Sequence, residues 1–238
     1  MATLEPMPSP SSLVGADFSK DFVTPSNNEV CDTGLAYACG DTGASGVGIV
    51  FYASAAPFAC GPNLASSCNF LEVAPNLWDP NSQNTCPKKS CGGSTQQTSD
   101  MSFSGKGITG CTGKGSKGNY MGPQATAVGA GYANTTAMLG VCNSYDAPGA
   151  ARAYTGGGMT DWSLPSLNEL IALYYYPNRN AIGGFVGNAY WSSTGSNFVT
   201  QCNDTMNFGG ITGGNGEMGQ YGPVVLRGPL AVRPVRAF

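Results

Sequence analysis

The spacing of the cysteines constrains this chain more than any other feature. Nine cysteines stand at positions 31, 39, 60, 68, 86, 91, 111, 142 and 202. No Cys-x-x-Cys pair occurs, so a zinc ribbon is not expected. Several neighbours lie close enough in sequence for local disulfide loops, which form and persist in an oxidising exterior. We predict the pairs Cys31–Cys39, Cys60–Cys68, Cys86–Cys91 and Cys111–Cys142, with Cys202 left unpaired.

The chain has no histidine, which removes the usual general base and the commonest metal ligand. A Ser-His-Asp triad, a Cys-His dyad and a His-ligated zinc site are therefore excluded within it. Asn203-Asp204 is the one pair typical of calcium sites, and it has too few carboxylates nearby for a hard cation. We predict no catalytic residues, no metal and no cofactor.

The composition predicts a folded core with long loops. Hydrophobic residues make up 41% of the chain, whereas charged residues make up only 11%. The 35 glycines favour loops and tight turns. A net charge of -3 argues against a nucleic-acid surface, which needs clustered Lys and Arg. No apolar run is long enough for a membrane span, and residues 1–10 lack the pattern of a signal peptide.

Apolar runs and capping residues predict a few short elements. Residues 47–53 read as a central strand buried on both faces, and residues 69–75 as a second strand. Residues 133–142 read as a short helix capped by Asn134. Trp78 reads as a core side chain. Residues 190–194 suit a strand, and Pro234 in the terminal run marks an edge or a bulge.

The best-defined element is a helix that begins at Ser166. Ser166-x-x-Glu169 is a capping box, in which each side chain accepts from the other residue's amide. The residues at i, i+3, i+4 and i+7 then form one buried stripe: Leu167, Leu170, Ile171 and Tyr174. Pro177 ends the helix.

Residues 195–221 differ from the rest of the chain, because amides and glycines dominate them. We predict a long polar surface loop here, and long loops in compact domains are typically functional or disordered. Amides beside aromatic rings suit adaptable recognition. The candidate ligand-binding residues are Trp191, Asn197, Gln201, Asn203, Asp204, Asn207, Asn215, Glu217 and Tyr221.

Several motifs together resemble a family of bacterial and phage surface domains with a C-type-lectin-like fold. The family includes the C-terminal domain of a collagen-like adhesin and is distantly related to the formylglycine-generating enzyme fold. The matching pieces are Trp162 to Ser166, Glu169-Leu170, Tyr174, Gly183 to Phe185, Tyr190 to Ser193 and Val232 to Phe238, with weaker pieces from residue 40 onward. Some relatives are targets of diversity-generating retroelements, which vary the stretch corresponding to residues 195–221. Here Cys202 and many glycines depart from their pattern.

The resemblance implies an α+β, C-type-lectin-like fold: small antiparallel sheets, two short helices and long Gly-rich loops, stapled by disulfides. It also implies that strand 47–53 pairs with the terminal strand 230–238, and that the long loop projects from the far end. We expect residues 31–238 to form a single domain. Residues 1–30, rich in Pro, Ser and Asn, read as an extended arm that packs on a neighbour or carrier, or as a disordered tail.

Two functions fit these features. The first is a non-enzymatic adhesion protein that recognises a cell-surface glycan or protein receptor through residues 195–221, with host recognition as its role if it is carried on a virion. The second is a structural subunit of a virion, fibre or filament that self-associates through the arm. Both place the protein outside the cell, on the surface of a virion or a bacterium. An enzyme is the least favoured class, because histidine and paired acids in a known motif are absent.

Overall fold

The computed structural model describes residues 31–76, 78, 101–102, 125–140, 147–183, 185, 189–195, 202–207, 221–225 and 229–238. For residues 101–102, 189, 202–207, 221–225 and 229–230 it defines the backbone pairing only. These residues form a mixture of helices and small antiparallel sheets with two disulfides, which confirms the predicted α+β class. The predicted arm, residues 1–30, lies outside the described residues.

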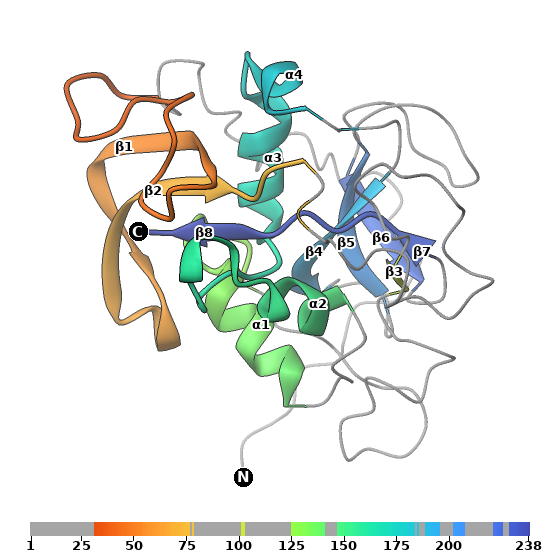
Figure 1. The fold of residues 1–238 in the computed structure, drawn as a ribbon. Helices are drawn as coiled ribbons and strands as arrows, with labels where there is room; N and C mark the ends of the chain where they lie inside the picture. Colours follow the sequence, from red (N-terminus) through yellow and green to blue (C-terminus); the bar gives the residue numbers. More distant parts are fainter. Residues whose placement is uncertain are drawn as a thin grey trace, which may run out of the picture.

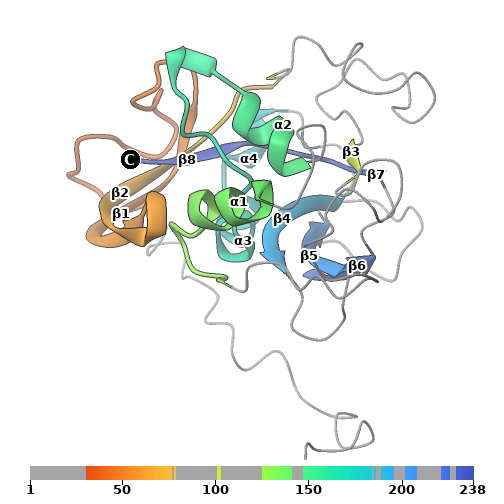
Figure 2. The same ribbon diagram turned by 90° about the horizontal axis from the view of Figure 1, so that it is seen from below.

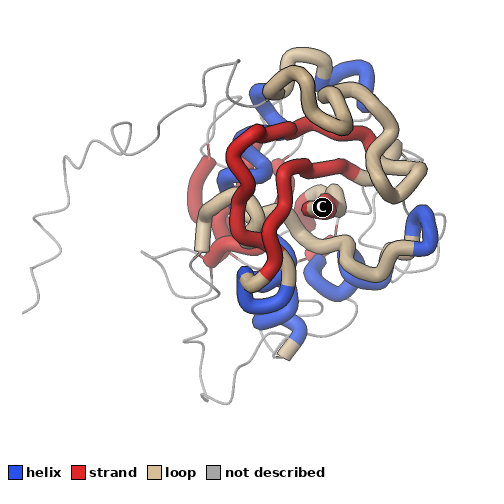
Figure 3. The backbone as a smooth tube through the Cα atoms, turned by 90° about the vertical axis from the view of Figure 1, so that its left-hand side faces the viewer, coloured by secondary structure: helices blue, strands red, loops and turns tan. Residues whose placement is uncertain are grey.

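The first sheet has three strands in the order β1 (Ile49–Cys60), β2 (Ser66–Val73) and β8 (Val235–Ala237). The expected pairing of the first strand with the terminal strand is wrong, because β2 lies between them. A tight hairpin places β2 against β1, and β2 then offers its other edge to the end of the chain. Figure 3 shows β1 and β2 curving around the C-terminus.

The first strand is therefore an edge strand and not the central one. Its core residues Val50, Phe51 and Ala53 are fully buried, as predicted. Their burial is possible because the chain before β1 covers the outer edge. Isolated bridges join Cys31 to Ala53 and Thr42 to Ile49 along this edge.

Two disulfides fasten this part of the molecule. Cys60–Cys68 joins β1 to β2, and Cys31–Cys39 closes the segment along the outer edge of β1. Both pairs are confirmed. The predicted pairs Cys86–Cys91 and Cys111–Cys142 lie outside the described residues, as does the side chain of Cys202.

Four helices lie in the described part of the chain, two more than expected. They are α1 (Gly131–Leu139), α2 (Ala147–Ala153), α3 (Leu167–Tyr175) and α4 (Arg179–Ile182). The predicted cap of the first helix is wrong, because Ala130 holds the N-cap position and Asn134 lies inside α1. The side-chain amide of Asn134 instead donates to the carbonyl of Ala125 at 2.7 Å, so tertiary contacts and not helix capping use this residue.

The capping box of α3 is confirmed. The amide of Ser166 donates to Glu169 Oε2 at 2.7 Å, and the amide of Glu169 donates to Ser166 Oγ at 3.3 Å. The apolar stripe faces the core, although Tyr174 is only half-buried. The helix ends at Tyr175, before Pro177, as the sequence predicts.

The second three-stranded sheet contains β4 (Ala189–Gly195), β5 (Cys202–Asn207) and β6 (Tyr221–Val225) in that order. The prediction of one long loop over residues 195–221 is therefore wrong in part, because its middle forms the central strand. Only Cys202 and Met206 are apolar in this strand, which leaves too weak an apolar period to reveal it in the sequence. A two-stranded sheet pairs β3 (Met101–Ser102) with β7 (Pro229–Leu230).

The terminal segment connects the sheets, as Figures 1 and 2 show. After β7, the carbonyl of Ala231 accepts from the amide of Trp191 in β4 at 3.0 Å. Val235 then exchanges two backbone hydrogen bonds with Ser163, both 2.9 Å, before β8 pairs with β2. The chain end thus bonds to elements on both sides of the molecule.

Two main groups of apolar side chains flank this segment. One packs α3 against β1 and β2 and includes Phe51, Leu170 and Tyr190. The other surrounds Trp162 and Trp191. Trp78 joins the second group and donates its indole N–H to the carbonyl of Val232, which confirms its predicted place in the core. Half-buried Phe238 stacks on Phe70 in a smaller cluster.

No helix in the described ranges has both the length and the apolar character needed to cross a membrane.

Removal of the hairpin disulfide should destabilise the protein measurably. We expect the double substitution Cys60→Ser/Cys68→Ser to lower the free energy of unfolding by about 3 kcal/mol, because the unfolded chain gains the freedom of an open loop. Urea unfolding measures the change, with Ser67→Ala in the exposed part of the same hairpin as the control. Unchanged stability, or a peptide map without the Cys60–Cys68 link, would contradict this pairing.

Candidate functional site

The structure places five of the nine predicted site residues. Asn203, Asp204 and Asn207 lie in β5, Tyr221 begins β6, and Trp191 lies in β4. The other four, Asn197, Gln201, Asn215 and Glu217, lie outside the described residues. The second sheet therefore brings together the backbone positions of those that can be placed.

The strand register divides these positions between the two faces of the sheet. Successive residues of a strand alternate between faces, so Asn203 and Asn207 share one face and Asp204 belongs to the other. Tyr221 pairs directly with Met206 and so shares the face of Asp204. A ligand on one face of the sheet would meet the two Asn positions or the Asp204 and Tyr221 positions, but not both sets.

Trp191 belongs to the core. Its side chain has 0% exposure and packs in the cluster that contains Trp162, Leu164 and Val232. It pairs with Thr205 of β5. Its ring anchors the sheet to the core. The prediction that Trp191 contacts a ligand is not supported by this buried position.

The strand that leads into the predicted binding segment is held by buried hydroxyl groups. Ser192, Ser193 and Thr194 come just before Gly195, and all three are buried. Their hydroxyls contact the segment before α1, the start of α3 and β4 itself. The position of this strand end is therefore determined from several directions.

Glu169 ties the two larger helices together. Its Oε1 accepts from the amides of Gly129 at 2.8 Å and Gly131 at 3.4 Å, while Oε2 accepts from Ser166. Burial raises the pKa of Glu169 to about 7, although these backbone N–H groups act to lower it. With its carboxyl oxygens used in this way, Glu169 acts as a structural tie between the start of α1 and the start of α3.

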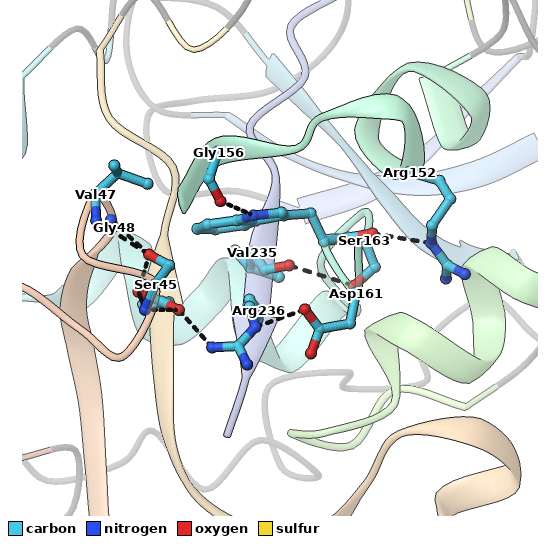
Figure 4. Close-up of polar contacts among 11 residues, drawn as sticks. Ser45, Val47, Gly48, Arg152, Gly156, Asp161, Ser163, Val235 and Arg236 are labelled. Carbon is cyan, nitrogen blue, oxygen red and sulfur yellow. Dashed lines mark hydrogen bonds and ion pairs between the residues drawn. The ribbon is translucent and has the colours of Figure 1, made fainter. Parts of the chain in front are cut away.

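A second polar network includes Arg236, Asp161 and Ser45, which Figure 4 labels, together with Glu72. Arg236 donates to Glu72 Oε1 at 2.8 Å and to Asp161 Oδ1 at 2.6 Å. Glu72 also accepts from the hydroxyl of Ser45 at 2.7 Å. The Trp162 indole N–H donates to the carbonyl of Gly156 at 3.1 Å. These contacts join the terminal strand to β2, to the loop before β1 and to the segment around Trp162, so the network braces these parts against one another.

Close packing explains why two glycines lie against the carboxylate of Glu72. A Cβ at Gly43 or Gly48 would fall 2.3 Å or 2.5 Å from Glu72 Oε2. The sequence pattern near Gly43 predicts only a turn and does not reveal the buried charge beneath it. The signal that could have revealed it is a lone Glu72 within an apolar run, matched by the arginines of the apolar terminal run.

The two terminal arginines are both mostly buried but differ in their partners. Burial acts to lower the pKa of Arg236, but hydrogen bonds and charge from Asp161 and Glu72 raise it overall. Arg233 has 0% exposure, donates from Nε to the carbonyl of Ala74 at 2.8 Å and lies over the ring of Phe185. Burial lowers the pKa of Arg233 to about 10. It stays charged at neutral pH and bridges residues far apart in sequence.

Within the described ranges, no three His, Cys, Asp or Glu side chains gather in a way that could hold a metal ion. The scan of protein-family models found no match to this sequence, and the search of curated proteins also found none.

Loss of Arg236 should cost far more than loss of its exposed partner. We expect Arg236→Met to lower the free energy of unfolding by about 3–5 kcal/mol, because it leaves the carboxylate of Glu72 buried without its cation. Asp161→Asn is the matched control, since its side chain is 41% exposed and such pairs contribute about 1 kcal/mol or less. Chemical denaturation at neutral pH compares the two, and equal losses would contradict the bracing role.

Proposed function

We propose that this chain is a non-enzymatic surface protein with a C-type-lectin-like fold that binds a cell-surface glycan or protein through residues 195–221. The observation that carries the proposal is the anchoring of the second sheet. Its first strand, β4, is buried from Tyr190 to Gly195, while its central strand β5 lies within the predicted segment. A fixed strand beside a polar segment provides a pre-organised base for recognition.

The residue types of the segment suit glycans and polar protein surfaces. An Asn side chain offers both an amide donor and a carbonyl acceptor, so Asn203 and Asn207 could bond to sugar hydroxyls in either sense. Asp204 would add an acceptor and Tyr221 an aromatic ring that loses little conformational entropy on binding. Because the register divides these positions, we propose that one of the two sets makes the principal contacts.

The uses of the buried carboxylates support a function other than catalysis. Glu169 accepts three backbone amides, and Glu72 is bound by Ser45 and Arg236. Both carboxyl groups are buried and used in these contacts, and the chain has no histidine to act with them. These groups stabilise the fold that would present the binding segment.

We further propose that the protein works outside the cell, on a virion or bacterial surface. The two disulfides support this location, because such bonds persist in oxidising compartments and are rare in the cytosol of mesophiles.

Replacement of the connecting segments tests the binding proposal. Residues 196–201 and 208–220 would be replaced by Gly/Ser linkers of equal length, with β5 kept, because removal of the central strand would disrupt the sheet. We expect binding to an array of immobilised glycans and to intact bacterial cells to fall by at least about tenfold, the loss of roughly one good polar contact.

The matched control replaces the exposed hairpin residues 62–65 by Gly/Ser, which should leave binding unchanged. Binding that survives both this replacement and the substitutions in β5 given below would place the site elsewhere. If the wild-type protein bound neither probe and eluted from size exclusion as a polymer, the structural-subunit function would be supported in place of recognition. If the wild type binds, Asn203→Ala/Asn207→Ala and Asp204→Ala are measured on the same probes. They show which face of the sheet makes the contacts.

A further inference from the structure

Two features coincide at the end of β4, where the predicted binding segment begins. Its last residues before Gly195 are hydroxyl side chains with almost no exposure: Ser192 and Ser193 at 0% and Thr194 at 1%. Its pairing with β5 also becomes irregular at the same place. Trp191 pairs with Thr205 and Gly195 with Asn203, so four steps along β4 match two along β5.

This irregularity is a β-bulge, and Ser192 stabilises it locally. The Ser192 hydroxyl accepts from the amide of Thr194 at 3.1 Å and lies 3.3 Å from its carbonyl oxygen. Bulges bend a strand and redirect the chain beyond it, and they are frequent next to functional sites. These residues therefore set the register between the end of β4 and β5.

Two further hydroxyls fix the bulge to other elements. Thr194 Oγ1 donates to the carbonyl of Ala125 and accepts from the amide of Leu167, both at 3.0 Å. Ser193 Oγ donates to the carbonyl of Pro165 at 3.1 Å and accepts from the side-chain amide of Asn134 at 3.3 Å. The strand end is thus bound to α1, to the segment before α1 and to the start of α3.

The Thr194 hydroxyl is both donor and acceptor, and both of its partners are backbone groups. One of them, Leu167, follows Ser166, whose amide donates to Glu169. Thr194 therefore links the end of β4 to the start of α3 and to the segment before α1.

We propose that Thr194 and the bulge at the end of β4 are a specificity-determining support, which positions β5 with Asn203 opposite Gly195 and so selects among ligands. This inference rests on the proposed function and assigns a role to residues that the sequence presents only as part of a Trp-Ser-Ser motif. Thr194 is a positioning residue, since it acts through the pairing of β4 with β5.

The test compares Thr194→Val, which keeps the shape but removes both hydrogen bonds, with Thr194→Ser, which keeps the hydroxyl. The control is Thr160→Val on the exposed surface. We expect Thr194→Val to speed amide exchange across residues 192–207 by about tenfold or more, because the amide of Leu167 and the carbonyl of Ala125 lose their partner. Exchange in β1 and β2 should stay unchanged, and Thr194→Ser and Thr160→Val should behave like the wild type.

A second measurement separates positioning from general stability. On the array of immobilised glycans, Thr194→Val should change the rank order of the ligands bound, whereas a merely structural role would weaken all of them equally. Unchanged exchange over residues 192–207, equal acceleration throughout the protein, or an unchanged rank order would overturn the proposal. If the wild type binds no glycan, the proposed function fails on this probe, while the exchange data still decide whether Thr194 supports the segment.

Discussion

The structure depends on the backbone pairing of its final ten residues. Ala231 accepts from Trp191, Val235 exchanges bonds with Ser163, and β8 completes the first sheet beside β2. The same segment carries Arg233 and Arg236 into the interior, where each bonds to a partner far away in sequence. Most such contacts form only when the chain end arrives, which implies slow folding for a chain of this topology. The disulfides Cys31–Cys39 and Cys60–Cys68 stabilise β1, β2 and the segment before them, which pair with the chain end only late in folding.

Polar groups inside this protein serve to position elements. Glu72 joins Arg236 to Ser45 in the loop before β1. Glu169 joins the starts of α1 and α3. The hydroxyl of Thr194 extends this system to the end of β4. With few charged residues in the chain, these buried ones have specific partners, as the cost of an unpaired buried charge requires.

Local signals in the sequence predicted what local physics determines. The capping box at Ser166, the stop at Pro177, the hairpin disulfide and the burial of Trp78 all arise from short-range chemistry, and the structure confirms them. Strand order was not predictable in this way, because hydrophobic pattern alone could not show that β2 comes between β1 and β8. The candidate site stays a prediction, which the sequence gives only as the region 195–221. Strand β5 was missed because its mostly polar sequence is typical of a loop, and the hydrogen bonds of Thr194 could not be predicted because their partners are far away in sequence.

Native-state hydrogen exchange in low denaturant tests most directly whether the final segment unites the molecule. The amide of Trp191 donates to Ala231 near the start of this segment. Near its end, the amide of Ser163 donates to Val235, and the amide of Val235 donates to Ser163. If the segment holds both sheets as one cooperative unit, all three amides should exchange with one free energy, equal to that of global unfolding. Exchange of Trp191 through an opening of much lower free energy than Ser163 and Val235 would contradict this, because the second sheet would then open on its own.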